Sequence, residues 1–299
     1  MTGKFFDEVR FDDLESLEEL QEIVNSNIRK YNESPQDDLG GLTPEQATSL
    51  MGPDWPGSDT PIGIKESLPE EEAREIRFVK NSRIFLETAR EKGGLPSTRA
   101  GNLKRKDVAY FLEKMKFNPD RVEQIRNGRT VINEKHVRPL NILRVFLETA
   151  ELIDHRDGRF HPTSKAQSML EPGRATEFMK YLFLTYFQEF DLTYFTECHE
   201  WNEFRDILPY SLYRLGQLDD GWHKVDILAD RMLLPSIFEL ADQRGEDILA
   251  LTYSIIILKP LCKFALLEGR KLGIKGIEDF DPQFRKTSLF DRFIEFDLQ

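Results

Sequence analysis

The segment Cys198-His199-Glu200 is the densest group of reactive side chains in the sequence: a thiol, an imidazole and a carboxylate in succession. Such groups can form a nucleophile with its base, or ligate a metal ion. Adjacent residues on a helix point about 100° apart, so these three side chains rarely act on one atom. We therefore expect a buried cysteine beside a partly exposed histidine, and we assign no catalytic residue.

Other motifs of enzymes and metal sites are missing from the sequence. The five histidines form no HExxH motif, and the two cysteines, Cys198 and Cys262, form no CxxC pair. No GxGxxG, GxxxxGK[ST] or GxSxG pattern occurs, which argues against dinucleotide, P-loop and hydrolase chemistry. The sequence thus predicts no metal site and no cofactor. An enzyme of unidentified type is the least favoured of three functional classes.

Charge is distributed unevenly along the chain, whose formal net charge is −12. Residues 1–70 carry 5 basic and 16 acidic side chains, residues 71–170 carry 21 and 14, and residues 171–299 carry 15 and 23. A basic block between acidic flanks is typical of a nucleic-acid footprint. Solvated helix faces would give the same distribution, and so would docking of the basic block onto the acidic flanks.

Ten side chains of this block are candidates for nucleic-acid binding, because Lys and Arg contact phosphates and polar side chains read base edges. They are Arg99, Lys104, Arg105, Lys106, Lys114, Lys116, Arg138, Asn141, Arg156 and Arg159. Two features oppose the assignment. The helix expected before Leu152 is crowded with apolar residues, and the negative charge of the whole chain weakens its attraction to DNA.

Apolar residues at steps of three and four predict a helix over 12–31. Thr43-Pro44-Glu45-Gln46 has the pattern of a capping box with proline in the first helical position, so a short helix should begin there. Residues 32–69 contain six prolines and five glycines and otherwise predict an irregular arm that wraps another part of the chain. A further helix is expected over 69–92, and after Thr176 the pattern predicts helices with few strands.

An internal repeat is the most informative feature of the sequence. Arg83-Ile84-Phe85-Leu86-Glu87-Thr88-Ala89 recurs as Arg144-Val145-Phe146-Leu147-Glu148-Thr149-Ala150, with six of seven residues identical. In the same order, Pro96-Ser97-Thr98-Arg99-Ala100 parallels Pro162-Thr163-Ser164-Lys165-Ala166. The repeat predicts a duplicated helix-turn-helix unit whose second helix begins at a Ser/Thr cap. Chance similarity between two amphipathic helices is the alternative.

The second copy contains a hairpin signal, Asp157-Gly158, between two short strand-like runs. A helix, this hairpin and then Thr163-Ser164-Lys165-Ala166 resemble the end of a winged helix-turn-helix domain. The resemblance covers roughly residues 74–170 and implies one helix in the major groove, with the hairpin near the backbone or minor groove. Separately, Gly93-Gly94-Leu95, Gly101-Asn102-Leu103-Lys104-Arg105 and residues 286–293 are similar to segments of uncharacterised bacterial proteins, some of them plasmid ORF-three-like. That similarity implies no activity.

Together these patterns predict a mostly α-helical protein in three parts. They are an N-terminal helix with an irregular arm (1–69), a duplicated helix-turn-helix region with one winged β-hairpin (70–172) and a C-terminal helical bundle (173–299). The sequence has no signal-peptide pattern, and its most apolar run, 253–267, contains two lysines and a proline, so we expect a cytoplasmic protein with no membrane partner.

The first functional expectation is a non-catalytic binding or scaffolding protein, with a protein partner or self-association. The second is nucleic-acid binding through residues 99–116 and 135–159.

Overall fold

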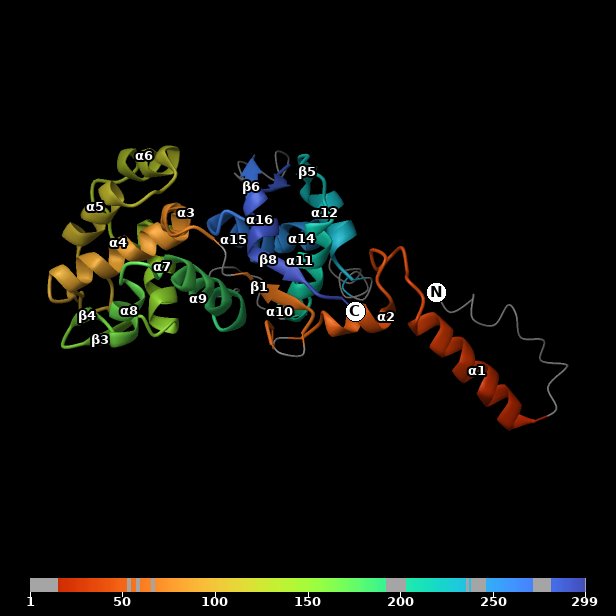
Figure 1. Cartoon of the computed structure of the whole chain (residues 1–299). Coiled ribbons are helices and arrows are strands. Elements are labelled where there is room, and N and C mark those ends of the chain that lie inside the picture. Colours follow the sequence, from red (N-terminus) through yellow and green to blue (C-terminus); the bar gives the residue numbers. More distant parts are fainter. Residues whose placement is uncertain are drawn as a thin grey trace.

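The computed structural model describes residues 16–52, 55–57, 60–65, 68–191, 203–234, 237, 246–270 and 281–298. This part of the chain is mostly helical and carries three small antiparallel sheets (Figure 1). Elements α3 to α9, with one sheet, lie on one side of the molecule, and α10 to α16, with the other two, lie on the opposite side. The expected helical character is confirmed. The boundaries of the three predicted parts stay a prediction.

Residues 77–169 form the first unit. Helix α4 (Arg77–Glu91) leads to strand β2 (Leu95–Pro96) and then to α5 (Arg105–Lys114) and α6 (Pro119–Asn127). A 3-10 turn, η2 (Glu134–His136), precedes α7 (Arg138–Thr149), β3 (Ile153–Arg156), β4 (Arg159–Pro162) and α8 (Ser164–Met169). Strand β4 pairs with both others, so the sheet order is β2-β4-β3. Asp157 and Gly158 both have positive φ, 51° and 67°, and form the tight turn that the sequence predicts.

The two copies of the repeated heptapeptide lie on α4 and α7, which lead into the two edge strands of this sheet. Each copy places a buried arginine, Arg83 or Arg144, in an ion pair with the glutamate four residues later. The second pair of similar segments, 96–100 and 162–166, differs in structure. Thr163 caps α8, whereas residues 97–104 form turns and α5 begins only at Arg105. The repeat yields two similar helices, and duplication of a whole helix-turn-helix unit is not confirmed.

The element order of the first unit recurs in residues 208–293, the second unit. Helix α11 (Leu208–Gly216) leads to β5 (His223–Lys224) and α12 (Val225–Met232). Helix α14 (Glu246–Tyr253), the π-helical turn η3 (Ser254–Leu258) and α15 (Lys259–Lys263) run on into β6 (Leu267–Arg270), β7 (Gln283–Lys286) and α16 (Ser288–Phe293). The strand in the centre of the sheet is again the last of the three along the chain, and the sheet order is β5-β7-β6. The predicted C-terminal helical bundle therefore contains a sheet that the sequence patterns do not indicate.

Equivalent hydrogen bonds close the hairpins of the two units. The N–H groups of Thr163 and Thr287 donate to the carbonyl oxygens of Leu152 and Leu266, both at 3.1 Å. The two threonine hydroxyls donate to the carbonyl of the residue before each leucine, at 2.8 and 2.7 Å, and that residue has positive φ in both units. The two units therefore share strand order, register and the backbone bend that starts the hairpin.

The N-terminal arm lies against the second unit. Helix α2 (Pro44–Ser49) begins with the predicted capping box, in which Thr43 and Gln46 bond reciprocally. Strand β1 (Ile62–Ile64) pairs with β8 (Ile294–Phe296), close to the end of the chain. Helix α1 (Leu17–Asn32) projects away from the other described elements (Figure 1). The predicted helix over 69–92 is divided at Ile76, whose extended backbone separates α3 (Glu70–Glu75) from α4.

An aromatic cluster joins the two sides of the molecule. The ring of Phe264, after α15, lies 5.1 Å from that of Phe78 on α4 and 5.3 Å from that of Phe183 on α9 (Ala175–Gln188). Tyr186 packs against both Phe78 and Phe264. All four side chains are buried, so this cluster fixes the first unit against the second.

Candidate nucleic-acid interface

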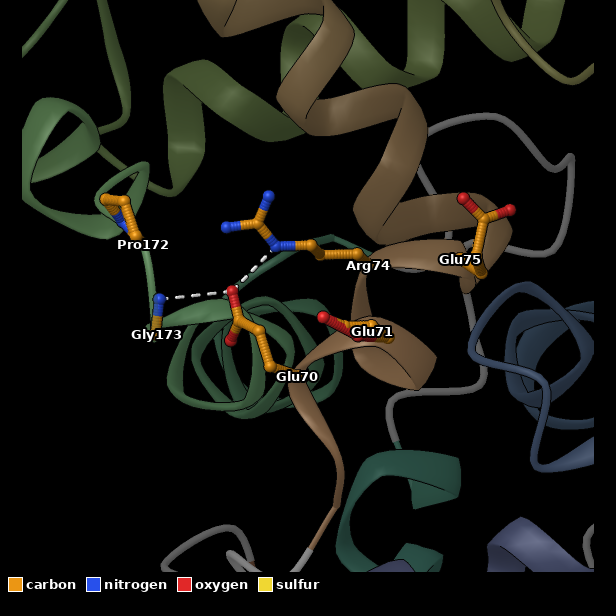
Figure 2. A pocket seen from close by; sticks show the side chains of 6 residues that line it. All are labelled: Glu70, Glu71, Arg74, Glu75, Pro172 and Gly173. Atoms are coloured by element: carbon orange, nitrogen blue, oxygen red, sulfur yellow. Dashed lines mark hydrogen bonds and ion pairs between the residues drawn. The ribbon is translucent and has the colours of Figure 1, made fainter.

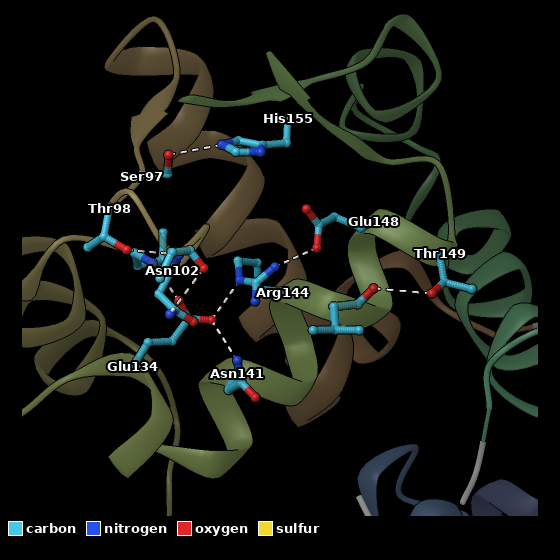
Figure 3. A network of polar contacts seen from close by, with 12 residues as sticks. Ser97, Thr98, Asn102, Glu134, Asn141, Arg144, Glu148, Thr149 and His155 are labelled. Atoms are coloured by element: carbon cyan, nitrogen blue, oxygen red, sulfur yellow. Dashed lines mark hydrogen bonds and ion pairs between the residues drawn. The ribbon is translucent and has the colours of Figure 1, made fainter. Parts of the chain in front are cut away.

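Glu134 is the centre of a polar network in the first unit (Figure 3). Its fully buried carboxylate accepts hydrogen bonds from the backbone N–H of Leu103 at 2.5 Å, from Asn141 at 3.0 Å and from Nε of Arg144 at 2.6 Å. Arg144 also contacts Glu148 at 2.5 Å. Burial raises the pKa of Glu148, and the charge of Arg144 opposes that rise. The network ties the start of α7 to the loop that precedes α5.

The same loop, residues 97–104, is fastened to the β3–β4 hairpin at its other end. The N–H of Ser97 donates to the carbonyl of Gly158 at 2.8 Å, and its hydroxyl lies 2.9 Å from Nε2 of His155 (Figure 3). Within the loop, the N–H of Asn102 donates to the Thr98 hydroxyl at 3.1 Å. A chain of hydrogen bonds therefore runs from the hairpin tip through the loop to the starts of α5 and α7.

Basic side chains follow this chain of contacts, and we call them the basic edge. They are Arg99 on the loop, Lys104, Arg105 and Lys106 at the start of α5, Arg138 at the start of α7 and Arg156 on the hairpin, all exposed. Arg105 donates to the side chain of Asn133 at 3.0 Å, which holds the starts of α5 and η2 together. Six of the ten predicted residues thus lie along one edge of the first unit.

The structure separates the other four candidates from the edge. Lys114 lies at the far end of α5, about 14 Å along the helix from Arg105. Lys116 forms an ion pair with Glu75 at 2.8 Å. Asn141 is directed to Glu134. Arg159 is half-buried and donates to the carbonyl oxygens of Lys92 and Gly94, which fastens the hairpin to the end of α4.

Two basic residues beyond the ten candidates lie close to the edge. Lys135 and Arg129 are exposed, and their charges lie near His136. Burial, followed by the charges of Arg129 and Lys135, lowers the pKa of this imidazole. Two further positive charges thus lie near the start of α7, and Lys135 falls within the predicted range 135–159.

Helix α7 offers little surface for reading bases. Leu140, Leu143, Arg144, Phe146 and Leu147 are buried, as the apolar sequence of this helix predicts. On α7 only Arg138, Pro139 and Thr149 are exposed. The side chains that could approach a nucleic acid therefore belong to the ends and loops around α7.

Within the described residues, three members of the basic edge lie free of the acidic flanks. In the part of the chain that the structure describes, Arg99, Lys104 and Lys106 form no ion pair, and the pair of Arg74 with Glu70 is a link from the basic block to a flanking acid. Three basic residues at the start of α5 also lie at the positive end of the helix dipole, which favours acids. The acid of this first turn, Asp107, is buried and pairs with Lys92 at 2.8 Å rather than with the basic edge.

A surface cleft lies elsewhere, between α3 and the turn before α9 (Figure 2). Its lining residues are Glu70, Glu71, Arg74, Glu75, Pro172 and Gly173. Burial raises the pKa of Glu70, but hydrogen bonds from Arg74, Ala175 and Gly173 outweigh it and hold the pKa below its ordinary value. Because the bond to the N–H of Ala175 satisfies the first turn of α9, this carboxylate has a structural role.

No described residues form a group of three or more potential metal ligands. The segment Cys198-His199-Glu200 lies outside the described residues. Among the helices that the structure describes, none has the length and apolar character needed to cross a membrane.

A comparison with protein families places the first unit in context. Residues 75–175 match the Y4jL N-terminal domain, so about a third of the chain is similar to that domain. The description of the family names a domain and states no activity. No curated protein and no solved structure matches the chain.

Proposed function

We propose that residues 77–169 are a winged helix-turn-helix domain that binds duplex nucleic acid through its phosphates. The support for the fold is the succession helix, strand, helices, strand, strand, with the central strand last and a tight hairpin before α8. In this proposal α7 occupies the position of the groove helix, and the β3–β4 hairpin is the wing.

The observation that carries the proposal is the basic edge. Its side chains reach from the wing to the start of α5, and three of them, Arg99, Lys104 and Lys106, have no acidic partner in the described chain. Lys and Arg displace condensed counterions from a duplex, so a group of them on one edge favours binding that falls steeply with salt. This group distinguishes the proposal from a scaffold, in which the same charges would dock on the acidic flanks.

Contacts to phosphates, rather than to bases, follow from the burial of α7. A reading helix needs several exposed polar side chains, and Asn141, the polar candidate on this helix, is directed to Glu134. The start of α5 suits a phosphate better, because Lys104 caps it without a side-chain hydrogen bond and the positive end of the helix dipole lies there. Binding should therefore depend weakly on sequence.

Fluorescence anisotropy of the full chain with labelled duplexes at low salt tests the proposal. If all six residues of the basic edge contact phosphates, log K against log salt should have a slope of about −5. Lys104→Ala and Lys106→Ala should each reduce the slope by about 1. Lys114→Ala is the matched control, since it removes one lysine from the far end of α5 and should leave the slope unchanged.

Absence of binding to several duplex sequences at low salt would overturn the proposal. Equal effects of Lys104→Ala and Lys114→Ala would show that binding follows net charge rather than this edge. Circular dichroism of each variant separates a loss of binding from a loss of folding.

A further inference from the structure

Helix α1 carries an apolar stripe with exposed members. Leu17, Leu20, Val24, Ile28 and Tyr31 fall within about 80° on the helix, because one residue advances about 100°. Leu17 is 80% and Ile28 45% exposed, while Leu20, Val24 and Tyr31 are half-buried. Single exposed apolar residues are ordinary, but a stripe on a projecting helix marks an interaction surface.

The spacing of the stripe is symmetric about Val24. Leu20 and Ile28 lie four residues to either side, and Leu17 and Tyr31 lie seven residues to either side. Two copies of such a helix in antiparallel orientation, crossing at Val24, place Leu20 of one level with Ile28 of the other. The apolar side chains then meet in matching layers along the whole helix, as knobs and holes require.

The charges of α1 favour the same orientation. Glu18 and Glu22 lie in its first half, and Arg29 and Lys30 lie in its last turn. These side chains lie about 120–160° around the helix from the centre of the stripe, so they act on a partner at long range. An antiparallel partner brings the acidic half of one helix near the basic half of the other, and it also opposes the two helix dipoles. A parallel partner would give up both effects.

We infer that α1 is a self-association helix, and that its partner is α1 of a second copy of this chain in antiparallel orientation. The occupant is a second copy because the stripe and the charges complement themselves. A helix of 16 residues is about 24 Å long, so two of them bury less area than a standard interface. The dimer should therefore dissociate within the micromolar range.

Cysteine crosslinking in the full chain tests the orientation, with the unsubstituted protein as a control for its two native cysteines. Val24→Cys should form a disulfide-linked dimer on mild oxidation, because the two copies of residue 24 meet at the crossing point. Leu17→Cys should not crosslink with itself, since its two copies lie about 21 Å apart, but should crosslink with Tyr31→Cys in a mixture. Crosslinking of Leu17→Cys with itself would mean a parallel pair and overturn the inference.

Light scattering across a concentration series measures the dissociation constant of the dimer and so tests whether the apolar stripe of α1 forms its interface. Leu20→Glu with Ile28→Glu should raise the dissociation constant at least about tenfold. Ser26→Glu is the matched control, because residue 26 points away from the stripe and should leave the constant unchanged. A chain that stays monomeric at high micromolar concentration overturns the inference. A dimer that persists in Leu20→Glu with Ile28→Glu overturns it as well.

Discussion

The carboxylate of Glu134 and the backbone N–H of Leu103 are joined by a 2.5 Å hydrogen bond across 31 residues of sequence. Glu134 is fully buried, and the bond fixes the loop before α5 against the start of α7. Because Lys104, Arg105 and Lys106 directly follow Leu103, a buried carboxylate sets the position of an exposed cationic row. The stability of the first unit and the shape of the basic edge therefore depend on the same residue.

Glu134→Ala should lower the free energy of unfolding by about 3–5 kcal/mol, because it removes one of the two acids paired with the buried guanidinium of Arg144 and leaves the N–H of Leu103 and the amide of Asn141 without their acceptor. Glu134→Gln keeps an acceptor for the N–H of Leu103 and should lower the free energy of unfolding by less than Glu134→Ala. Urea unfolding followed by circular dichroism measures both. Glu113→Ala, an exposed acid on α5, is the control and should stay within about 0.5 kcal/mol. Equal losses for Glu134→Ala and Glu113→Ala would contradict the role of the network.

Arg156 and Arg159 flank the hairpin turn and should behave differently. Arg159→Ala removes hydrogen bonds to two backbone carbonyls and should cost about 2 kcal/mol of stability. Arg156 is exposed, with Asp154 3.6 Å away, so Arg156→Ala should leave stability nearly unchanged. In the proposed function, Arg156→Ala instead reduces the salt slope of duplex binding by about 1. Thermal unfolding and anisotropy on the same two variants compare these effects, and a reversed pattern would contradict the division of roles.

Local signals in the sequence were sufficient for the features that local chemistry determines. Asp157-Gly158 predicted a hairpin because both turn positions need positive φ, and Thr43 with Gln46 predicted a helix start because their side chains bond to each other's backbone. The cationic run at 104–106 was predictable because its members are consecutive. Each of these signals lies within a few residues.

Features that depend on distant partners were not predictable in the same way. Strand β5 has two residues, too few for any alternation, and it exists because it pairs with β7, about sixty residues later. In the sequence Lys116 and Arg159 both look like free cations. The fold brings Glu75 beside Lys116 and the end of α4 beside Arg159, and neither partner is a neighbour in the sequence. The recurrence of the first unit in residues 208–293 leaves only a short trace in the sequence, the pattern Phe-x-x-Thr-Ser at 160–164 and 284–288, because it preserves mainly strand order and the bonds of these two threonines.

Stability in acid should depend on Glu75. Hydrogen bonds from Lys116 and Lys80 lower the pKa of this exposed carboxyl from 4.5 to about 2. A lowered pKa means that the charged form stabilises the folded state above pH 4.5, and that this contribution is lost as the pH falls toward 2. Glu75→Gln should therefore be less stable than the unsubstituted chain at neutral pH, and the difference should vanish near pH 2.

Melting temperatures measured over this pH range check the prediction. Lys116→Ala removes one of the two partners and should reproduce part of the same pH dependence. Because the groups are exposed, high salt should reduce the difference at neutral pH. A difference between Glu75→Gln and the unsubstituted chain that stays constant with pH would contradict the assignment.

Phe264 should couple the unfolding of the two units. Its ring is fully buried between Phe78 and Phe183, which lie on the opposite side of the molecule. Phe264→Ala should lower the free energy of unfolding by about 3–5 kcal/mol. Because the lost contacts cross between the units, calorimetry should show one unfolding transition in the unsubstituted chain and two in the variant. Phe111→Ala is the matched control: its ring is equally buried but stacks on Phe85 inside the first unit, at 5.1 Å. It should lower the melting temperature without dividing the transition, and a single transition in both variants would mean that contacts other than this cluster hold the units together.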